Sequence, residues 1–348
     1  MTYSAGGLIQ AADYNGFADT NVGANVNATW GTGVTSAGYG QTAIATVSAA
    51  GTVTATQWAT LVNNIASMAA HQGTTITARS APVATNLIQI LAAVNTDITS
   101  CYNNRGNAVA NGTQFTGYTG TNSKTTQTGT SGGGPWTITF TNTVTFASAD
   151  AARYFFNAGG RIKIDVAKSS TGLTGDPEWN DLATTLCGDI FITGGDYTQT
   201  IAGTAYTGTT KVGGTGTPNT LATTTGWFDL TPGAAATIVY KQFADSAPYT
   251  ANFIQHSIAK NAGSTVLTIT TLWSASDTNT PPVGGTDPIT GGTAASGATP
   301  GTAPCTIVTY FPPSTPGTAP CTIVTYFPPS TTYLSASWGT PTVAATTV

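Results

Sequence analysis

Apolar residues in the first third of the chain recur with the spacing of an α-helix. Between residues 53 and 73 they lie three or four positions apart, on one face of a helix: Trp58, Leu61, Val62, Ile65, Met68 and Ala69. Thr54 and Gln57 have the spacing of a capping box at the start of this helix, and Gly73 is a suitable residue to end it. We therefore predict a long amphipathic helix over this range.

Two more segments of the N-terminal region have helical patterns. Residues 85–106 carry an apolar stripe that would let this segment pair with the first helix, and a shorter helix is expected to begin near Ala11. Residues 31–41 contain too many glycines for a helix and are predicted to form a loop. Residues 1–110 are therefore predicted to form a helical region that serves attachment or assembly.

The pattern changes to a period of two after residue 135, as expected for β-strands. Residues 136–146 alternate apolar side chains with polar ones, mostly threonines, which predicts a half-buried strand. Residues 161–166 alternate isoleucine and valine with three charged residues: Arg161, Lys163 and Asp165. We predict that these charges share the outer face of a second strand, where they are candidates for a contact with a neighbouring subunit.

Short apolar segments separated by glycine and proline continue to about residue 276. Strands are expected over 189–195, 204–212, 226–231, 236–243, 249–261 and 264–276. A helix is predicted before them, with Asp176 as its N-cap and Pro177 as its first residue. The inner face of this helix is expected to consist of Trp179, Leu182, Ala183 and Leu186.

Together these patterns predict an α+β fold, with an N-terminal helical region, an antiparallel, sandwich-like β-rich domain and an extended C-terminal segment. The predicted boundaries are 1–110 for the helical region, 111–135 for a Gly/Thr-rich linker or loop, 136–277 for the β-rich domain with short helices, and 278–348 for a low-complexity loop and a duplicated strand segment. The duplicated sequence, TPGTAPCTIVTYFPPS, occupies 299–314 and again 315–330. It reflects either a recent in-frame duplication or an error in assembling the sequence.

The charge content restricts the partners that this chain can have. Only 7% of its residues are charged, ten of them are Lys or Arg, and the net charge is −4. This composition argues against nucleic-acid binding and against attraction to an anionic membrane, and no apolar run is long enough to insert into a bilayer. Weak electrostatic repulsion favours self-association, so we expect a homo-oligomer, with a trimer favoured.

Residues that could carry catalysis are sparse. Asp176, Glu178 and Asp181 form the one tight acidic cluster, and the start of a helix explains it better than a glycosidase site. His71 and His256 lack a neighbouring nucleophile motif, and the four cysteines have no metal-binding or redox spacing. We therefore predict no enzymatic activity, no cofactor and no metal. Five aromatic residues could stack on sugars, although core positions are more typical of them: Trp227, Tyr240, Tyr249, Tyr310 and Tyr326.

The stretch ADAARYFFNAGGRIKID at residues 149–165 resembles a phrase found in virion structural proteins of tailed bacteriophages, notably cyanophages. In that family a helix turns sharply into a strand at this phrase. The residues that match are Ala152, Tyr154, Phe155, Phe156, Asn157, Gly159, Gly160 and Ile162. Four further stretches resemble the same family in the same order along the chain: 9–15, 38–41, 53–73 and 326–343.

The resemblance implies a non-enzymatic virion component, and we expect a tail- or neck-associated fibre or appendage protein. Its partners would be copies of itself, other virion proteins and a glycan or protein on the host surface. It would be assembled in the host cytoplasm and exposed on the particle. A head decoration protein, a bacterial surface adhesin or extracellular filament subunit, and a polysaccharide depolymerase on a phage tail are the alternatives. The depolymerase would need an acidic pair in a groove.

Overall fold

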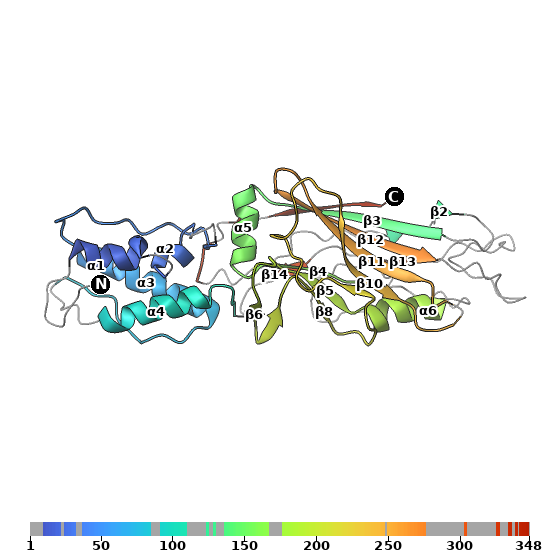
Figure 1. The fold of residues 1–348 in the computed structure, drawn as a ribbon, viewed down its shortest axis with the longest axis horizontal. Coiled ribbons are helices and arrows are strands. Elements are labelled where there is room, and N and C mark those ends of the chain that lie inside the picture. Colours follow the sequence, from blue (N-terminus) through green and yellow to red (C-terminus); the bar gives the residue numbers. More distant parts are fainter. Residues whose placement is uncertain are drawn as a thin grey trace, which may run out of the picture.

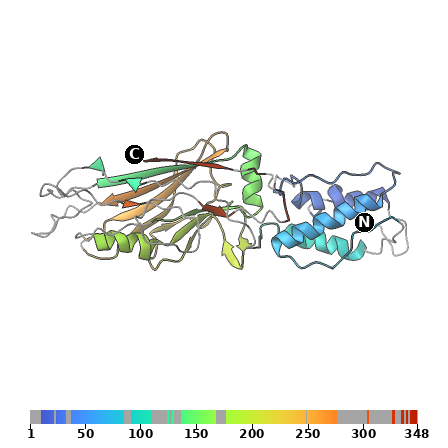
Figure 2. The ribbon, with the colours of Figure 1, turned by 180° about the vertical axis from the view of Figure 1, so that it is seen from behind.

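A computed structural model gives the arrangement of the chain. It describes residues 10–21, 24–32, 37–84, 91–109, 123–124, 128–129, 136–166, 176–247, 249–275, 303–304, 325–327, 333–335, 338–339 and 341–347. Helices α1 to α4 lie together at one end of an elongated molecule, and the sheets occupy the other end (Figure 1). Helix α5 stands between these two parts in both views (Figures 1 and 2). We call the two parts the helical module, residues 10–109, and the β-rich module, residues 136–347.

The helical module contains α1 (Ala11–Asn15), which continues into the π-helical turn η1 (Gly16–Thr20), then α2 (Val26–Thr29), α3 (Ala55–Gln72) and α4 (Leu91–Asn103). The predicted capping box of α3 is confirmed. The Thr54 hydroxyl accepts from the Gln57 N–H at 3.3 Å, and the Gln57 carboxamide accepts from the Thr54 N–H at 2.8 Å. Gly73 ends α3 with a φ of 71°. The sequence pattern did not predict α2, which is capped by the side chain of Asn25.

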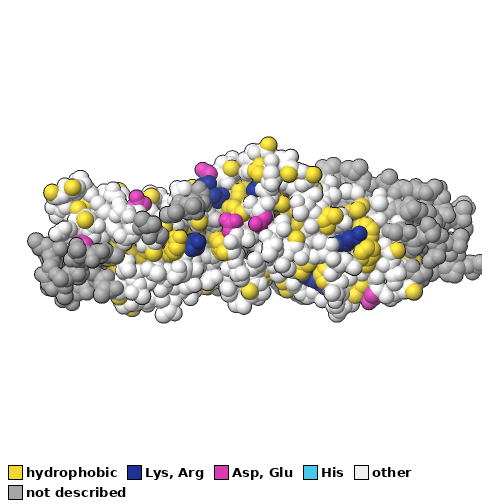
Figure 3. Space-filling model, viewed as in Figure 1, with side chains coloured by type: hydrophobic (Ala, Val, Ile, Leu, Met, Phe, Trp, Pro, Cys, Tyr) yellow, Lys and Arg dark blue, Asp and Glu magenta, His cyan; other side chains and the backbone are white. Residues whose placement is uncertain are grey.

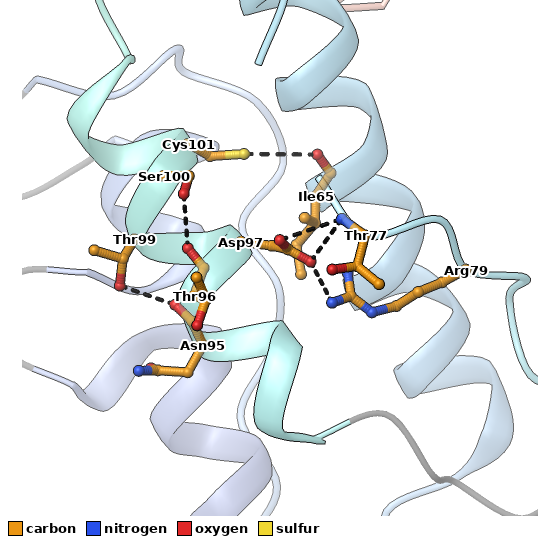
Figure 4. A network of polar contacts seen from close by, with 9 residues as sticks. All are labelled: Ile65, Thr77, Arg79, Asn95, Thr96, Asp97, Thr99, Ser100 and Cys101. Atoms are coloured by element: carbon orange, nitrogen blue, oxygen red, sulfur yellow. Dashed lines mark hydrogen bonds and ion pairs between the residues drawn. The ribbon is translucent and has the colours of Figure 1, made fainter. Parts of the chain in front are cut away.

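The core of the helical module forms around the buried face of α3. All six apolar residues predicted on that face are buried. Trp58 meets the ring of Tyr14 from α1 edge-on, with ring centroids 5.7 Å apart. A buried ion pair between Asp97 of α4 and Arg79 lies beside this core, and the Thr77 N–H donates to both Asp97 oxygens at 3.3 Å (Figure 4). These contacts hold the segment after α3 against α4.

The large sheet of the β-rich module is antiparallel, with the strand order β15-β3-β12-β11-β10-β9 and with β2 also paired to β3. Its strands are β2 (Thr128–Gly129), β3 (Trp136–Thr145), β9 (Thr220–Leu221), β10 (Thr237–Phe243), β11 (Phe253–Lys260), β12 (Val266–Ala275) and β15 (Thr342–Thr347). Alternate residues of β3, β11 and β12 are buried, which confirms the predicted period of two. Strand β15 pairs with β3 and places Val343 opposite Val144.

A smaller antiparallel sheet has the order β14-β4-β5-β8. Its strands are β4 (Arg161–Ile164), β5 (Asp189–Ile192), β8 (Thr209–Val212) and β14 (Thr325–Phe327); a hairpin of β6 (Gln199–Ile201) and β7 (Thr204–Tyr206) and a short pair of β1 (Ser123–Lys124) and β13 (Ala303–Pro304) complete the list. Strand β14 belongs to the second copy of the duplicated segment. The equivalent strand of the first copy lies outside the described residues, as do most of the predicted linker and the low-complexity loop.

Both sheets contribute to one hydrophobic core, together with α6 (Asp176–Asn180) and the π-helical segment η3 (Asp181–Cys187). The four residues predicted on the inner face of this helix are buried, and Trp179 stacks on Trp273 of β12 with centroids 5.6 Å apart. Asp176 is the first residue of α6 and not its N-cap, so the helix begins one position earlier than predicted. The predicted α+β fold, with its antiparallel β-rich part, is confirmed.

Two of the predicted strands were wrong in detail. Residues 226–231 form turns because the Asp229 carboxylate accepts from the Gly226 N–H at 2.7 Å and bends the chain. The segment 204–212 divides into β7 and β8, with Gly208 in a left-handed conformation between them. Strand β6 was not predicted, because its three residues are too few to establish an alternation.

Candidate functional site: the junction between the modules

Helix α5 (Ala149–Asn157) is the structural form of the phage-like phrase, and its ends are fixed by Ser148 and by two glycines. The Ser148 hydroxyl accepts from the Ala151 N–H at 3.0 Å at the N-terminus. Gly159 takes a φ of 87° at the C-terminus. A Cβ at Gly160 would lie 2.5 Å from the carbonyl oxygen of Phe155, so this position requires glycine. The predicted corner between a helix and a strand is therefore present, with β4 following at once.

The aromatic residues of α5 divide between the two modules. Phe155 and Phe156 are fully buried on the side of the β-rich core, and Phe156 stacks on Trp227 with centroids 5.5 Å apart. Tyr154 lies against Gly40 from the segment that precedes α3. A Cβ at Gly40 would meet the Tyr154 ring at 2.3 Å. Helix α5 thus anchors in one module while one of its side chains packs closely against the other.

Two buried hydrogen bonds join the end of α5 to the helical module. The Asn157 side-chain amide donates to the Gly38 carbonyl at 2.9 Å, and Asn157 is 1% exposed. His71, at the end of α3, lies 3.0 Å from the Ala158 carbonyl oxygen through Nε2, which must donate because a carbonyl only accepts. His71, which the sequence left without a catalytic role, therefore links the two modules.

A C-terminal segment closes the same region. The Gln41 carboxamide donates to the Ser335 carbonyl at 2.9 Å and accepts from the Ser335 N–H at 2.9 Å and from its hydroxyl at 2.6 Å. Leu334 and Trp338 on either side are buried. Three segments in this region belong to the stretches that resemble phage proteins: 38–41, 154–160 and 333–339. Segment 38–41 packs against α5, which includes part of segment 154–160. Segment 333–339 forms hydrogen bonds with segment 38–41. We call this contact region the junction.

Arg105, just after α4, adds cation–π contacts to the junction. The Arg105 guanidinium lies 4.3 Å from the ring centroid of Tyr102 and 5.6 Å from that of Tyr197. The Tyr197 hydroxyl donates to the Asn157 carbonyl at 3.3 Å, and the Tyr39 hydroxyl donates to the Arg105 carbonyl at 2.6 Å. Burial raises the pKa of Tyr197 to about 12 and that of Tyr39 well above its usual value. Both phenols therefore stay neutral donors at physiological pH.

The three charged residues of segment 161–166 require a correction. Lys163 is only 6% exposed, and its ammonium pairs with Asp189 of β5 at 2.7 Å. Arg161 lies over the rings of Phe191 and Tyr206, at 5.0 and 4.5 Å, because the β6–β7 hairpin covers this face of the small sheet. Non-local packing therefore places these charges in contacts within their own chain, and the prediction of an open charged face was wrong for Lys163.

Asp165 is half-buried, less so than Lys163. Partial burial raises the pKa of its carboxyl from 3.8 to about 7, an effect that Lys163 partly opposes. The Asp165 carboxyl therefore titrates near neutral pH.

Several other sequence candidates lie in the core. His256 is buried against Thr271, with Nδ1 and the Thr271 hydroxyl 2.9 Å apart, and burial lowers its pKa to about 3. Trp227 and Tyr240, considered for sugar stacking, are buried. Glu178 and Asp181 are half-buried on α6 and η3, while the side chain of Asp176 lies outside the described residues.

Three further findings on the described residues and on known proteins are negative. No group of three or more His, Cys, Asp or Glu residues in the described ranges could hold a metal ion. No helix within those ranges has the length and apolar character needed to cross a membrane. The whole chain matches no protein-family model, no curated protein and no solved structure.

Proposed function

We propose that this protein is a non-enzymatic structural subunit of a tailed-phage virion, a tail- or neck-associated fibre or appendage protein. In this proposal the helical module attaches the subunit to the particle, and the β-rich module projects from it toward the host surface. The observation that carries the proposal is the junction: sequence stretches that resemble virion proteins, far apart along the chain, form the connection between the two modules.

The chemistry of the junction supports a mechanical role. Its described hydrogen bonds involve amides, phenols, backbone groups and one imidazole, and none of them joins two ionised groups. Salt screens interactions between charges, so contacts of this kind should keep their strength over a wide range of ionic strength. A particle component that leaves the cell at lysis meets such changes, and a connection whose hydrogen bonds do not depend on ion pairs suits it.

The elongated arrangement supports the same role. The modules lie end to end with α5 between them, so forces on one end reach the other through the junction (Figure 1). Charged side chains are scattered and few on the face shown in Figure 3. Sparse charge favours packing into an assembly, because charges are depleted from the centres of protein interfaces.

The test is to locate the protein on phage particles that encode it. Antibodies raised against the recombinant chain should place gold label at the tail or neck in electron micrographs of purified virions. The same antibodies, adsorbed beforehand with the recombinant chain, provide the control. Label over the capsid would assign the protein to head decoration. Absence of label, together with absence of the chain from mass spectra of the purified particles, would refute a virion role.

A further inference from the structure

We propose that the outer face of the large sheet is an interface that packs against the same face of a second copy of this chain. The outer face is the side opposite to the core. It carries the half-buried positions of β3, β12 and β11 and the exposed residues Thr342 and Ala344 of β15. The proposal stands apart from the virion role, since a self-associating sheet is compatible with any structural function, and it gives a dimer in place of the trimer favoured by the sequence alone.

The centre of the outer face is built from small, uncharged residues. Every outward position of β3 from Thr137 to Thr145 is a threonine. Thr141 lies opposite Thr270 of β12, and Thr270 lies opposite Ser257 of β11. Larger side chains flank this centre on β11 and β12, and they are also uncharged: Phe253, Gln255, Val266 and Leu272. The outward positions of these strands therefore carry no charged residue.

Charge appears only at the margin of this face. Lys241 of β10 lies over the rings of Phe243 and Phe253, at 4.6 and 3.7 Å. Placing a charge inside a sheet-to-sheet contact would cost several kcal/mol of desolvation, and the centre of this face avoids that cost. A surface without charge does not repel a second copy of itself, so no like-charge repulsion opposes self-association through this face.

The dimensions and the edges of the sheet favour face-to-face packing. Strands about 4.8 Å apart with a rise of about 3.3 Å per residue give a patch of about 600 Å² over four strands. Two copies would therefore bury about 1,200 Å², the lower end of the range for specific interfaces. Strand β15 covers the edge of β3 from Phe140 to Thr145, and β9 covers part of β10 at the other edge. Growth by edge pairing is thereby restricted, and the open face remains.

Threonine also lowers the cost of forming such a contact. Its branched side chain has few accessible χ1 rotamers, so little conformational entropy is lost when it becomes buried. Two sheets that stack by their faces lie about 10 Å apart, with their side chains interdigitated between them. A two-fold axis through the centre of the face would bring each row against the equivalent row of the partner, as in isologous dimers.

The experiment uses the full chain and measures its mass in solution by light scattering after size exclusion. We expect a dimer for the wild type and a monomer for the double variant Thr141→Lys/Thr270→Lys, which places four like charges across the two-fold axis. The control variant Thr60→Lys/Asn63→Lys puts the same charge on exposed positions of α3 and should stay dimeric. A monomeric or trimeric wild type, or a lysine variant that keeps the dimer mass, would overturn the proposal.

A charge-reversal pair separates loss of the interface from loss of the fold. Thr141→Glu/Thr270→Glu should also be monomeric, and an equimolar mixture of the lysine and glutamate variants should recover the dimer mass. Recovery requires two folded chains whose modified faces meet. A mixture that remains monomeric, although circular dichroism shows both variants folded, would exclude the outer face as the interface.

Discussion

Replacing Gly40 by alanine tests how closely the two modules pack at the junction. Gly40 has a φ of 67°, and a Cβ there would lie 2.3 Å from the ring of Tyr154. The left-handed conformation costs a residue with a Cβ about 1–2 kcal/mol. Moving the ring out of a packed position costs about 1–3 kcal/mol. The variant should therefore lose about 2–5 kcal/mol, a large part of the 5–15 kcal/mol that stabilises a typical domain.

Urea unfolding of a set of variants would separate these two contributions. Gly203→Ala is the matched control, because Gly203 also has a positive φ, of 81°, and a Cβ there would meet nothing within 4 Å. It should show the conformational cost alone. In a Tyr154→Ala background, Gly40→Ala should cost no more than this control. The double-mutant cycle should then give a coupling energy of about 1–3 kcal/mol between the two positions.

Two outcomes would refute this reasoning. If Gly40→Ala changes the free energy of unfolding by no more than Gly203→Ala, the Tyr154 ring does not constrain the junction. If the cost of Gly40→Ala is the same with and without the ring, the cause lies in the backbone alone, and the close contact between modules contributes nothing to stability.

Three further changes have expected outcomes. Asp97→Asn removes the partner of buried Arg79 and should cost about 3–5 kcal/mol in urea unfolding, whereas the paired variant Asp97→Leu/Arg79→Met should cost less. Because folding raises the pKa of Asp165 from 3.8 to about 7, the folded chain binds an extra proton between these values. The free energy of unfolding should fall by at most about 1.4 kcal/mol per pH unit as pH rises through that window, and Asp165→Asn should remove this slope. Ser148→Ala should lower stability by about 1 kcal/mol in thermal unfolding by removing the cap of α5, while Ser148→Asp should be nearly neutral.

The parts of the fold that sequence predicted are those whose signals are local. Helix α3 has a capping box, an apolar face and a terminal glycine within one stretch, and all three are confirmed. Strands β3, β11 and β12 are long enough for their alternation to be unambiguous. Short elements such as α2 and β6 offer too few residues for a period, so neither could be predicted.

The candidate site depends on contacts that no local pattern contains. The helix-to-strand corner at α5 could be expected from the resemblance, and its cap and terminal glycine lie within one short stretch. The bond between Asn157 and Gly38 spans 119 residues, and the bonds between Gln41 and Ser335 span 294. Neither Gln41 nor Ser335 has a sequence feature that distinguishes it from other polar residues. Lys163 was misplaced for the same reason, because its partner Asp189 lies on a strand later in the chain.

The place of β15 beside β3 has a consequence for biosynthesis. A ribosome must complete Thr342–Thr347 before the β3 edge can be covered, and it must complete Ser335 before Gln41 finds its partner. Nascent chains therefore carry an open strand edge, which can pair with other chains, and such late long-range pairing slows folding. A prematurely terminated product would lack both contacts. Only translation through β15 yields a chain whose β3 edge is covered, so the fold itself distinguishes chains that contain this strand from those truncated before it.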